Sequence, residues 1–168
     1  VSTLYRDNYG LTWFTLDAPN QPEDVEVIGL RHSGEGELSA LDGGLGEPLR
    51  LTYNIDGASW IYEGDFDNAA RTFTVRRVLV GEGELAEGVA EALHHEAATG
   101  RYALSFSSTT SPSQLYILEA DGSFKRLTNE RPVGIPTEWL AMGESMPYIS
   151  HDGLRMAARL YMPAPVLG

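Results

Sequence analysis

Three arginines in an acidic chain are the residues best suited to bind a ligand. Arg71, Arg76 and Arg77 lie in the run RTFTVRRVLV (71–80), whose alternation of apolar and polar side chains predicts a long strand. Successive side chains of a strand point to opposite faces, so we expect Arg76 and Arg77 to point apart. An inward arginine could grip a carboxylate through two parallel hydrogen bonds. The alternative is an ion pair within the chain, with Asp65, Asp67 or Glu82.

The histidines do not form a metal-binding pattern. None of the four has a second histidine four residues away together with a carboxylate partner. His94 and His95 are adjacent, so on a strand they would face opposite sides and could not share an ion. We expect structural roles for His32, His94, His95 and His151, and we expect neither a metal nor a cofactor.

An acidic stretch, Glu63 to Asn68, offers oxygen ligands at alternating positions, as calcium sites do. It lacks the glycine and the terminal glutamate of an EF-hand loop. We therefore interpret it as a polar turn that leads into the strand at 71–80.

Composition excludes several classes of function. The chain has 168 residues, a net charge of −12 and no cysteine. Nucleic acids and anionic membrane surfaces require basic stripes that this chain lacks. The absence of cysteine leaves no disulfide framework and fits a reducing compartment, so we expect a cytoplasmic protein. Neither a signal peptide nor an apolar run long enough to span a membrane is expected.

The elements that must position these residues are predicted to be short antiparallel strands. The clearest stretch is Arg101–Thr128, where alternating residues predict strands at 101–107, 114–119 and 124–128, with a hairpin turn at Asp121-Gly122. Three such strands form a meander, which needs similar neighbours to bury both of its faces.

The remaining strands are less regular. We predict strands at Ser2–Arg6, Leu11–Leu16 and Val25–Leu30, and a turn at Ala18–Pro22. The segment Leu85–His95 is ambiguous, because its alanines and glutamates favour a helix whereas its place in the repeat favours strands.

Related segments recur along the chain with a mean spacing of about 35 residues, which is typical of the blades of a β-propeller. They begin near Leu11, Leu38, Leu85 and Leu115. The predicted fold is therefore all-β: a partial β-propeller of antiparallel meander blades that ends in a further hairpin. The alternative is an ordinary β-sandwich with coincidental turn spacing.

The C-terminal part changes character. Residues 129–137 contain two prolines and show no periodicity, whereas 148–162 predicts a hairpin around His151-Asp152-Gly153.

This part of the chain resembles the prolyl oligopeptidase family of serine peptidases, and acylaminoacyl peptidases in particular. Gln114–Thr128 (QLYILEADGSFKRLT) is similar to the last propeller blade of that family, and Gly100–Ser113 fits a strand of the same blade. Met146–Pro163 (MPYISHDGLRMAARLYMP) is similar to the junction with its α/β-hydrolase domain. The resemblance implies about two and a half to three blades over 1–128, a linker over 129–145 and the start of the hydrolase domain over 146–168.

The resemblance implies a parent enzyme that cleaves short peptides by a Ser-His-Asp mechanism, with the propeller limiting access and orienting the peptide. The G-x-S-x-G nucleophile motif is absent, and Gly143-Glu144-Ser145-Met146-Pro147 ends in proline instead of glycine. We therefore expect no catalytic residue in this chain and no activity of the chain alone.

Substrate-binding residues would be Arg71, Arg76 and Arg77, holding a peptide carboxylate. Expected partners are short peptides and either the rest of the parent chain or further copies of this one, because open sheet edges seek partners. The alternative function is a self-standing, non-enzymatic β-propeller that serves as a binding module.

Overall fold

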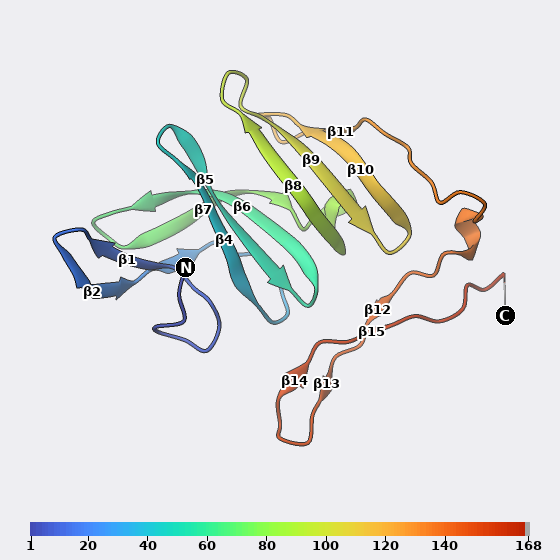
Figure 1. Ribbon diagram of the computed structural model, residues 1–168, viewed down its shortest axis with the longest axis horizontal. Helices are drawn as coiled ribbons and strands as arrows, with labels where there is room; N and C mark the ends of the chain where they lie inside the picture. The colour runs from blue at the N-terminus through green and yellow to red at the C-terminus, as the bar shows by residue number, and fades with distance from the viewer. Residues whose placement is uncertain (167–168) are drawn as a thin grey trace. The chain divides into compact units, whose positions relative to one another are not determined.

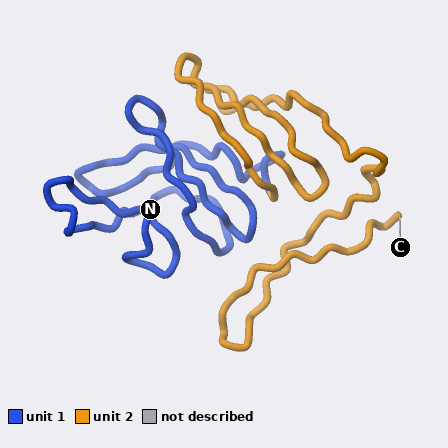
Figure 2. Tube along the Cα trace, viewed as in Figure 1, with its two compact units in different colours: residues 1–86 blue, residues 87–168 orange. Residues whose placement is uncertain are grey.

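The computed structural model describes residues 1–166 and consists of β-strands joined by turns (Figure 1). Within these residues there is no α-helix, only two single-turn 3-10 helices, η1 (Gly83–Leu85) and η2 (Thr137–Trp139). The prediction of an all-β fold is confirmed. None of the described helices has the length and apolar character needed to cross a membrane. The chain divides into two compact units, residues 1–86 and 87–168 (Figure 2).

The first unit contains a five-stranded sheet in the order β3-β7-β6-β5-β4. Its strands are β3 (Glu26–Ile28), β4 (Gly36–Gly44), β5 (Glu47–Ile55), β6 (Ala58–Asp67) and β7 (Thr72–Val80). Strands β4 to β7 form an antiparallel meander, and β3 adds to the β7 edge in parallel. A four-stranded antiparallel meander is the blade unit of β-propellers, so this sheet is propeller-like.

Tight turns set the register of the meander. Asp56 and Gly57 both have positive φ, at 49° and 86°, and connect Ile55 to its cross-strand partner Ala58. This is the two-residue turn that Asp-Gly favours, because its twist matches that of the flanking strands.

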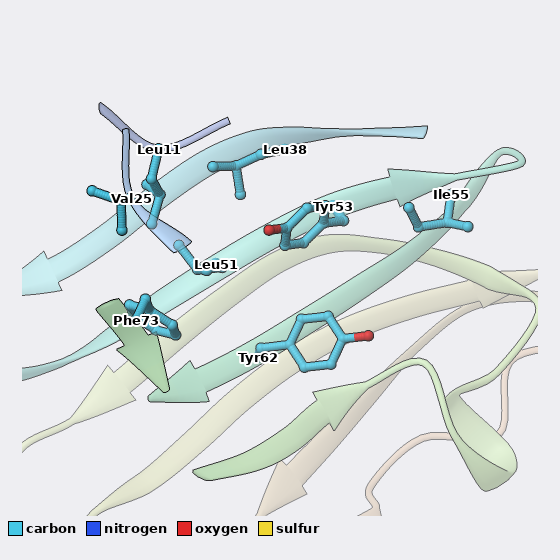
Figure 3. Close-up of a cluster of buried hydrophobic side chains, with 8 residues drawn as sticks. All are labelled: Leu11, Val25, Leu38, Leu51, Tyr53, Ile55, Tyr62 and Phe73. Carbon is cyan, nitrogen blue, oxygen red and sulfur yellow. The ribbon is translucent and has the colours of Figure 1, made fainter. Parts of the chain in front are cut away.

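One face of the sheet packs against the N-terminal segment to form the core of the unit (Figure 3). Leu11 and Val25 come from the N-terminal segment, and the sheet supplies the other buried members. Those are Leu38, Leu51, Tyr53, Ile55, Tyr62 and Phe73.

The N-terminal prediction was wrong in two places. Residues 3–8 form a loop, with only the bridge Ser2↔Gly10, where we expected a strand at 2–6. The expected turn at 18–22 is instead strand β2 (Ala18–Asp24), which pairs with β1 (Thr12–Thr15). Strand β2 pairs with β1 alone, and an edge strand tolerates prolines that a central strand would reject.

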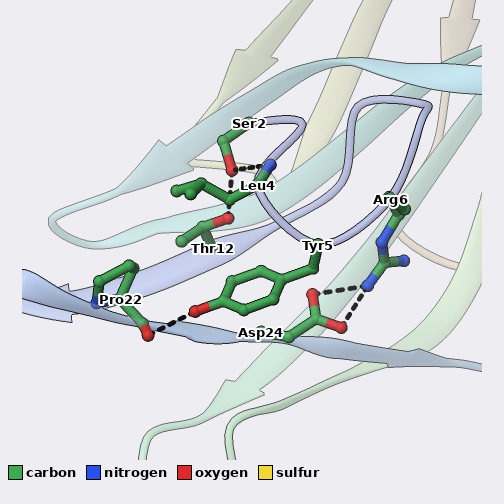
Figure 4. A network of polar contacts seen from close by, with 7 residues as sticks. All are labelled: Ser2, Leu4, Tyr5, Arg6, Thr12, Pro22 and Asp24. Carbon is green, nitrogen blue, oxygen red and sulfur yellow. Dashed lines mark hydrogen bonds and ion pairs between the residues drawn. The ribbon is translucent and has the colours of Figure 1, made fainter.

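Polar contacts fasten the N-terminal loop to the β1–β2 hairpin (Figure 4). The Tyr5 hydroxyl donates to the Pro22 carbonyl at 2.5 Å, and Arg6 binds Asp24 with Nη2 2.5 Å from a carboxylate oxygen. The Ser2 and Thr12 hydroxyls also form a hydrogen bond. These contacts hold an otherwise irregular segment in place beside the hairpin.

The second unit begins with a four-stranded antiparallel meander. Its strands are β8 (Gly88–Glu96), β9 (Arg101–Ser108), β10 (Ser111–Leu118) and β11 (Phe124–Arg126). The meander predicted for 101–128 is confirmed. The ambiguous segment at 85–95 is strand β8 from Gly88 onward, because cross-strand pairing with β9 outweighs its helical propensity.

Gln114 fastens the end of this meander. Its buried amide accepts from the Glu130 N–H and the Thr128 hydroxyl, both at 2.9 Å, and donates to the Glu130 carbonyl at 2.8 Å. These bonds satisfy a polar group that would be costly to bury without partners.

The C-terminal part forms an extended two-step hairpin. Strand β12 (Glu144–Ser145) pairs with β15 (Arg159–Leu160), and β13 (Tyr148–Ile149) pairs with β14 (Arg155–Met156). The hairpin predicted over 148–162 is confirmed, with its turn at residues 150–154. Strand β12 falls inside the segment 129–145 that we predicted to be a linker.

Candidate functional site

Two of the three predicted arginines meet at one glutamate. Arg76 and Arg77 of β7 both bind the Glu63 carboxylate of β6, with N–O distances of 3.0 Å and 2.9 Å to its two oxygens. Arg76 also pairs with Asp65 at 3.1 Å. We name Glu63, Asp65, Arg76 and Arg77 the arginine cluster.

A β-bulge explains how neighbouring residues reach the same carboxylate. Glu63 lies opposite Arg77, but Gly64 lies opposite Val75, so Arg76 is an extra residue in β7. A bulge leaves one residue unpaired and turns its side chain away from the regular alternation. The prediction that Arg76 and Arg77 point to opposite faces was wrong for this reason.

Glu63 is buried, with an exposed fraction of 5%. Its cross-strand neighbour on β5 is Arg50, so Arg50, Glu63 and Arg77 form a row across three strands. Arg50 is buried as well, donates to the Pro48 carbonyl at 3.1 Å and lies 3.6 Å from Glu47. A carboxylate in such surroundings is tolerated only because cations and hydrogen bonds compensate it.

The placement of Glu63 also corrects the interpretation of the acidic stretch. Residues 63–67 belong to strand β6, and the turn follows at 68–71. Asp67 accepts hydrogen bonds from the N–H groups of Ala69 and Ala70, which lower the pKa of its carboxyl. Throughout residues 1–166, no group of three or more histidine, aspartate and glutamate residues is arranged to hold a metal ion.

Arg76 is the member of the cluster best placed to exchange partners. Its side chain is half exposed, and that of its partner Asp65 is more exposed still, at 66%. Water screens such a pair and makes it weak, so another carboxylate could replace Asp65. Arg77 is more enclosed and is paired with the buried Glu63.

Arg71 makes contacts different from those of the arginine cluster. It occupies the turn before β7, pairs with Glu23 at 3.2 Å and stacks on Trp13, with its guanidinium carbon 3.4 Å from the ring centroid. The structure therefore brings Arg76 and Arg77 together and gives Arg71 different partners.

A second cluster, which we did not predict, surrounds His32. Its ring lies 5.1 to 5.8 Å from those of Tyr53, Trp60 and Tyr62, measured between centroids. The Tyr62 hydroxyl accepts the backbone N–H groups of Arg31 and His32 at 3.3 Å and 3.0 Å, and lies 2.8 Å from Nδ1 of His32. The only signal in the sequence was the alternation of Trp60 and Tyr62.

The electrostatics of this cluster favour neutral groups. Burial lowers the pKa of His32 and raises that of Tyr53 to about 12. Burial also raises the pKa of Tyr62, although the two backbone hydrogen bonds act against it. With its lone pairs occupied by two N–H donors, the Tyr62 hydroxyl donates its proton to Nδ1 of a neutral His32.

The other histidines lie on strand β8 or in the C-terminal hairpin. The His95 ring packs against that of Tyr102 in a tilted arrangement, with 4.8 Å between centroids, and His151 lies in the exposed turn between β13 and β14. That these histidines have structural roles remains a prediction.

Compared with known proteins, the chain matches no protein-family profile and no curated protein.

Proposed function

We propose that this chain is the non-catalytic, propeller-type part of a serine peptidase that cleaves short peptides, of the prolyl oligopeptidase family. The observation that carries this proposal is the pair of segments 114–128 and 146–163, which follow one another as the last blade and the junction do in that family. The fold supports it, because 114–128 contributes strands to a four-stranded meander and 146–163 contains a hairpin.

In this role the chain would limit access and orient the peptide, while the nucleophile, base and acid would come from another part of the enzyme. Arg76 is the residue we assign to a free carboxylate of the peptide, in place of Asp65. Arg77 would support it through their shared partner Glu63. Arg71 has a separate carboxylate partner and would act at a different position.

Exposed apolar side chains on the C-terminal hairpin support the idea of a missing partner. They include Tyr148, Ile149, Leu154, Tyr161 and Met162. An apolar surface of this kind commonly marks an interaction site. The remainder of the parent enzyme is the partner we propose, in the cytoplasm, where a chain without cysteine is well suited.

The test is to express the protein encoded by the complete gene beside the 168-residue chain and to treat both with a fluorophosphonate probe for reactive serines. We expect the probe to label the complete protein outside these residues and to leave the chain unlabelled. The complete protein should hydrolyse short peptides and spare folded proteins. In it, Arg76→Ala should raise KM for peptides with a free carboxylate by about tenfold and leave kcat nearly unchanged, because the lost contact is made equally in the ground and transition states.

Asp65→Asn is the matched control for this substitution, because it removes the competing carboxylate and keeps the arginine. A complete protein that neither reacts with the probe nor hydrolyses peptides would contradict the proposal. It would favour a non-enzymatic binding module instead.

A further inference from the structure

A cleft of about 230 Å3 lies in the first unit, lined by residues of β1 and of β4 to β7 together with Leu11 and Val25, which come directly before β1 and β3. Seven of its eight lining residues are apolar, and the eighth is Thr12. No charged side chain lines it. A concave apolar site with a single polar group is typical of a site for a small apolar ligand.

The floor of the cleft is part of the core. Phe73, at 1% exposed, lies there with Val25 and Leu11, which are also buried. Figure 3 shows these three side chains at the end of the core cluster opposite Ile55. Because core packing fixes them, the floor keeps its shape without a ligand. The rim is open to solvent at Leu41 on strand β4, which is 45% exposed.

The indole of Trp13 forms one wall of the cleft, and the side chain of Arg71 packs against this indole. The Arg71 guanidinium stacks on the indole, and its Nε pairs with Glu23. The backbone of Arg71 is left-handed, with φ at +55°, and its carbonyl accepts the Glu26 N–H at 3.1 Å. This conformation is sterically unfavourable for any residue other than glycine. Backbone strain of this kind is often found at sites that hold ligands.

We propose that this cleft binds a small neutral aromatic molecule of one or two rings, with Trp13 as the stacking wall and Arg71 as the residue that positions Trp13. The size follows from the volume, because an apolar cavity of about 150 Å3 accepts benzene and this cleft is larger. Neutrality follows from the lining, since a buried charge would find no partner there. All the residues involved belong to the first unit, so this inference does not depend on the proposed peptidase function.

Indole is the probe we choose, because it is neutral, bicyclic and soluble. In an NMR titration of the 15N-labelled chain, we expect saturable shifts of the Trp13 indole N–H and of the backbone amides of Thr12 and Phe73. Nuclear Overhauser contacts from indole protons to the side chains of Leu41 and Phe73 should place it in the cleft. Shifts that do not saturate, or contacts that lie elsewhere, would overturn the site.

Leu41→Trp should fill the cleft and weaken indole binding at least about tenfold, because the added ring occupies the volume of the ligand. Leu16→Trp is the matched control: Leu16 is exposed in the β1–β2 turn outside the cleft, and this variant should bind indole as the wild type does. If Leu41→Trp binds indole with unchanged affinity, the cleft is not the site. The contacts measured on the wild-type chain test the site independently, should either variant fold poorly.

The variant Arg71→Gly tests whether Arg71 positions Trp13 for ligand binding, separately from any effect of Arg71 on the stability of the fold. Glycine accepts the left-handed backbone without strain, so the unfolding midpoint in urea should change little, while indole affinity falls about threefold or more as Trp13 loosens. Arg71→Lys keeps the positive charge and loses the planar stacking group, and should lower affinity as well. Unchanged affinity in both variants would show that Arg71 does not position Trp13 for binding.

Discussion

At the scale of single residues, Glu63 decides how the arginine cluster is held together. It is the only buried carboxylate among the described residues, and it lies between Arg50 and Arg77 in the row across the sheet while also binding Arg76. Replacing it by glutamine should lower the free energy of unfolding by about 3 kcal/mol, because it removes one charge of a largely buried pair with Arg77, whose side chain is only 25% exposed. Urea denaturation followed by circular dichroism measures this loss.

Asp65→Asn is the control for that experiment, because the Arg76–Asp65 pair is exposed to water. We expect a change of less than about 1 kcal/mol for it. Equal losses in the two variants would contradict the idea that burial of Glu63 makes it decisive.

His32 should make stability depend on pH near neutrality. Burial lowers its folded-state pKa below the ordinary value of 6.5, and protonated Nδ1 would face the Tyr62 hydroxyl donor to donor. As the pH falls below 6.5, the unfolded chain binds a proton that the folded chain resists, so stability decreases. His32→Phe keeps a ring among its aromatic neighbours and should flatten this dependence between pH 7 and 5.5, measured by urea midpoints.

His151→Phe, in an exposed turn, is the matched control and should retain the wild-type slope. The charged groups that act on the cluster are Arg31 and Glu82, which act on Tyr62, and Arg6, which acts on Tyr53. An unchanged slope in His32→Phe would assign the pH dependence to other groups.

Residue types predicted part of the candidate site but not its geometry. The charges of Arg76 and Asp65 were sufficient to foresee their ion pair as an alternative. Glu63 was missed because its acidic neighbours are typical of a turn, whereas cross-strand pairing extends β6 to Asp67. The bulge at Arg76 follows from the register of two strands, which no single run of residues specifies.

At the scale of elements, the connection after β7 depends on one glycine. Gly81 has φ at +125°, and a Cβ there would lie 2.4 Å from ring atoms of Trp60. Gly81→Ala should therefore cost about 3 kcal/mol in the free energy of unfolding, from both backbone strain and overlap with the indole. Thermal and urea unfolding of the variant measure this cost.

Gly57→Ala is the matched control in the β5–β6 turn. It has φ at +86° but open space around its Cβ position. Only the backbone cost of about 1 kcal/mol should appear there. If the two alanine variants lose the same stability, contact with Trp60 contributes nothing.

Local sequence signals predicted the hairpins well, because an Asp-Gly pair by itself favours a tight turn between two strands. They failed at the N-terminus, where residues 2–8 are held by side-chain contacts to β2 instead of by strand pairing. The letters GEGEL occur at 34–38 and 81–85, and each copy precedes or opens the first strand of a meander, β4 or β8. By contrast, residues 37–43 (ELSALDG) and 114–122 (QLYILEADG) are similar in sequence but fall on the first strand of one meander and the third strand of the other, so this similarity does not correspond in structure.

At the scale of the whole molecule, unpaired sheet edges and exposed apolar side chains are features that favour binding to another chain. The second sheet ends in the short and exposed strand β11, whose outer edge has no neighbouring strand among the described residues. On the first sheet, the Tyr9 carbonyl accepts the Leu38 N–H and covers only part of the β4 edge. Open edges of this kind favour pairing with another chain.

We therefore predict that the purified chain associates with copies of itself. Sedimentation velocity should show species heavier than the 18.4 kDa monomer, in amounts that increase with concentration. The double variant Ile149→Lys and Tyr161→Lys places charges on the exposed apolar hairpin and should shift the distribution toward monomer, because buried charges oppose apolar association. Val133→Lys, at an exposed apolar residue outside the hairpin, controls for the added charge. A wild-type chain that stays monomeric at about 100 μM would contradict this prediction. Specific protein pairs of micromolar affinity would associate at that concentration, so its sheet edges and its hairpin would then not mediate self-association.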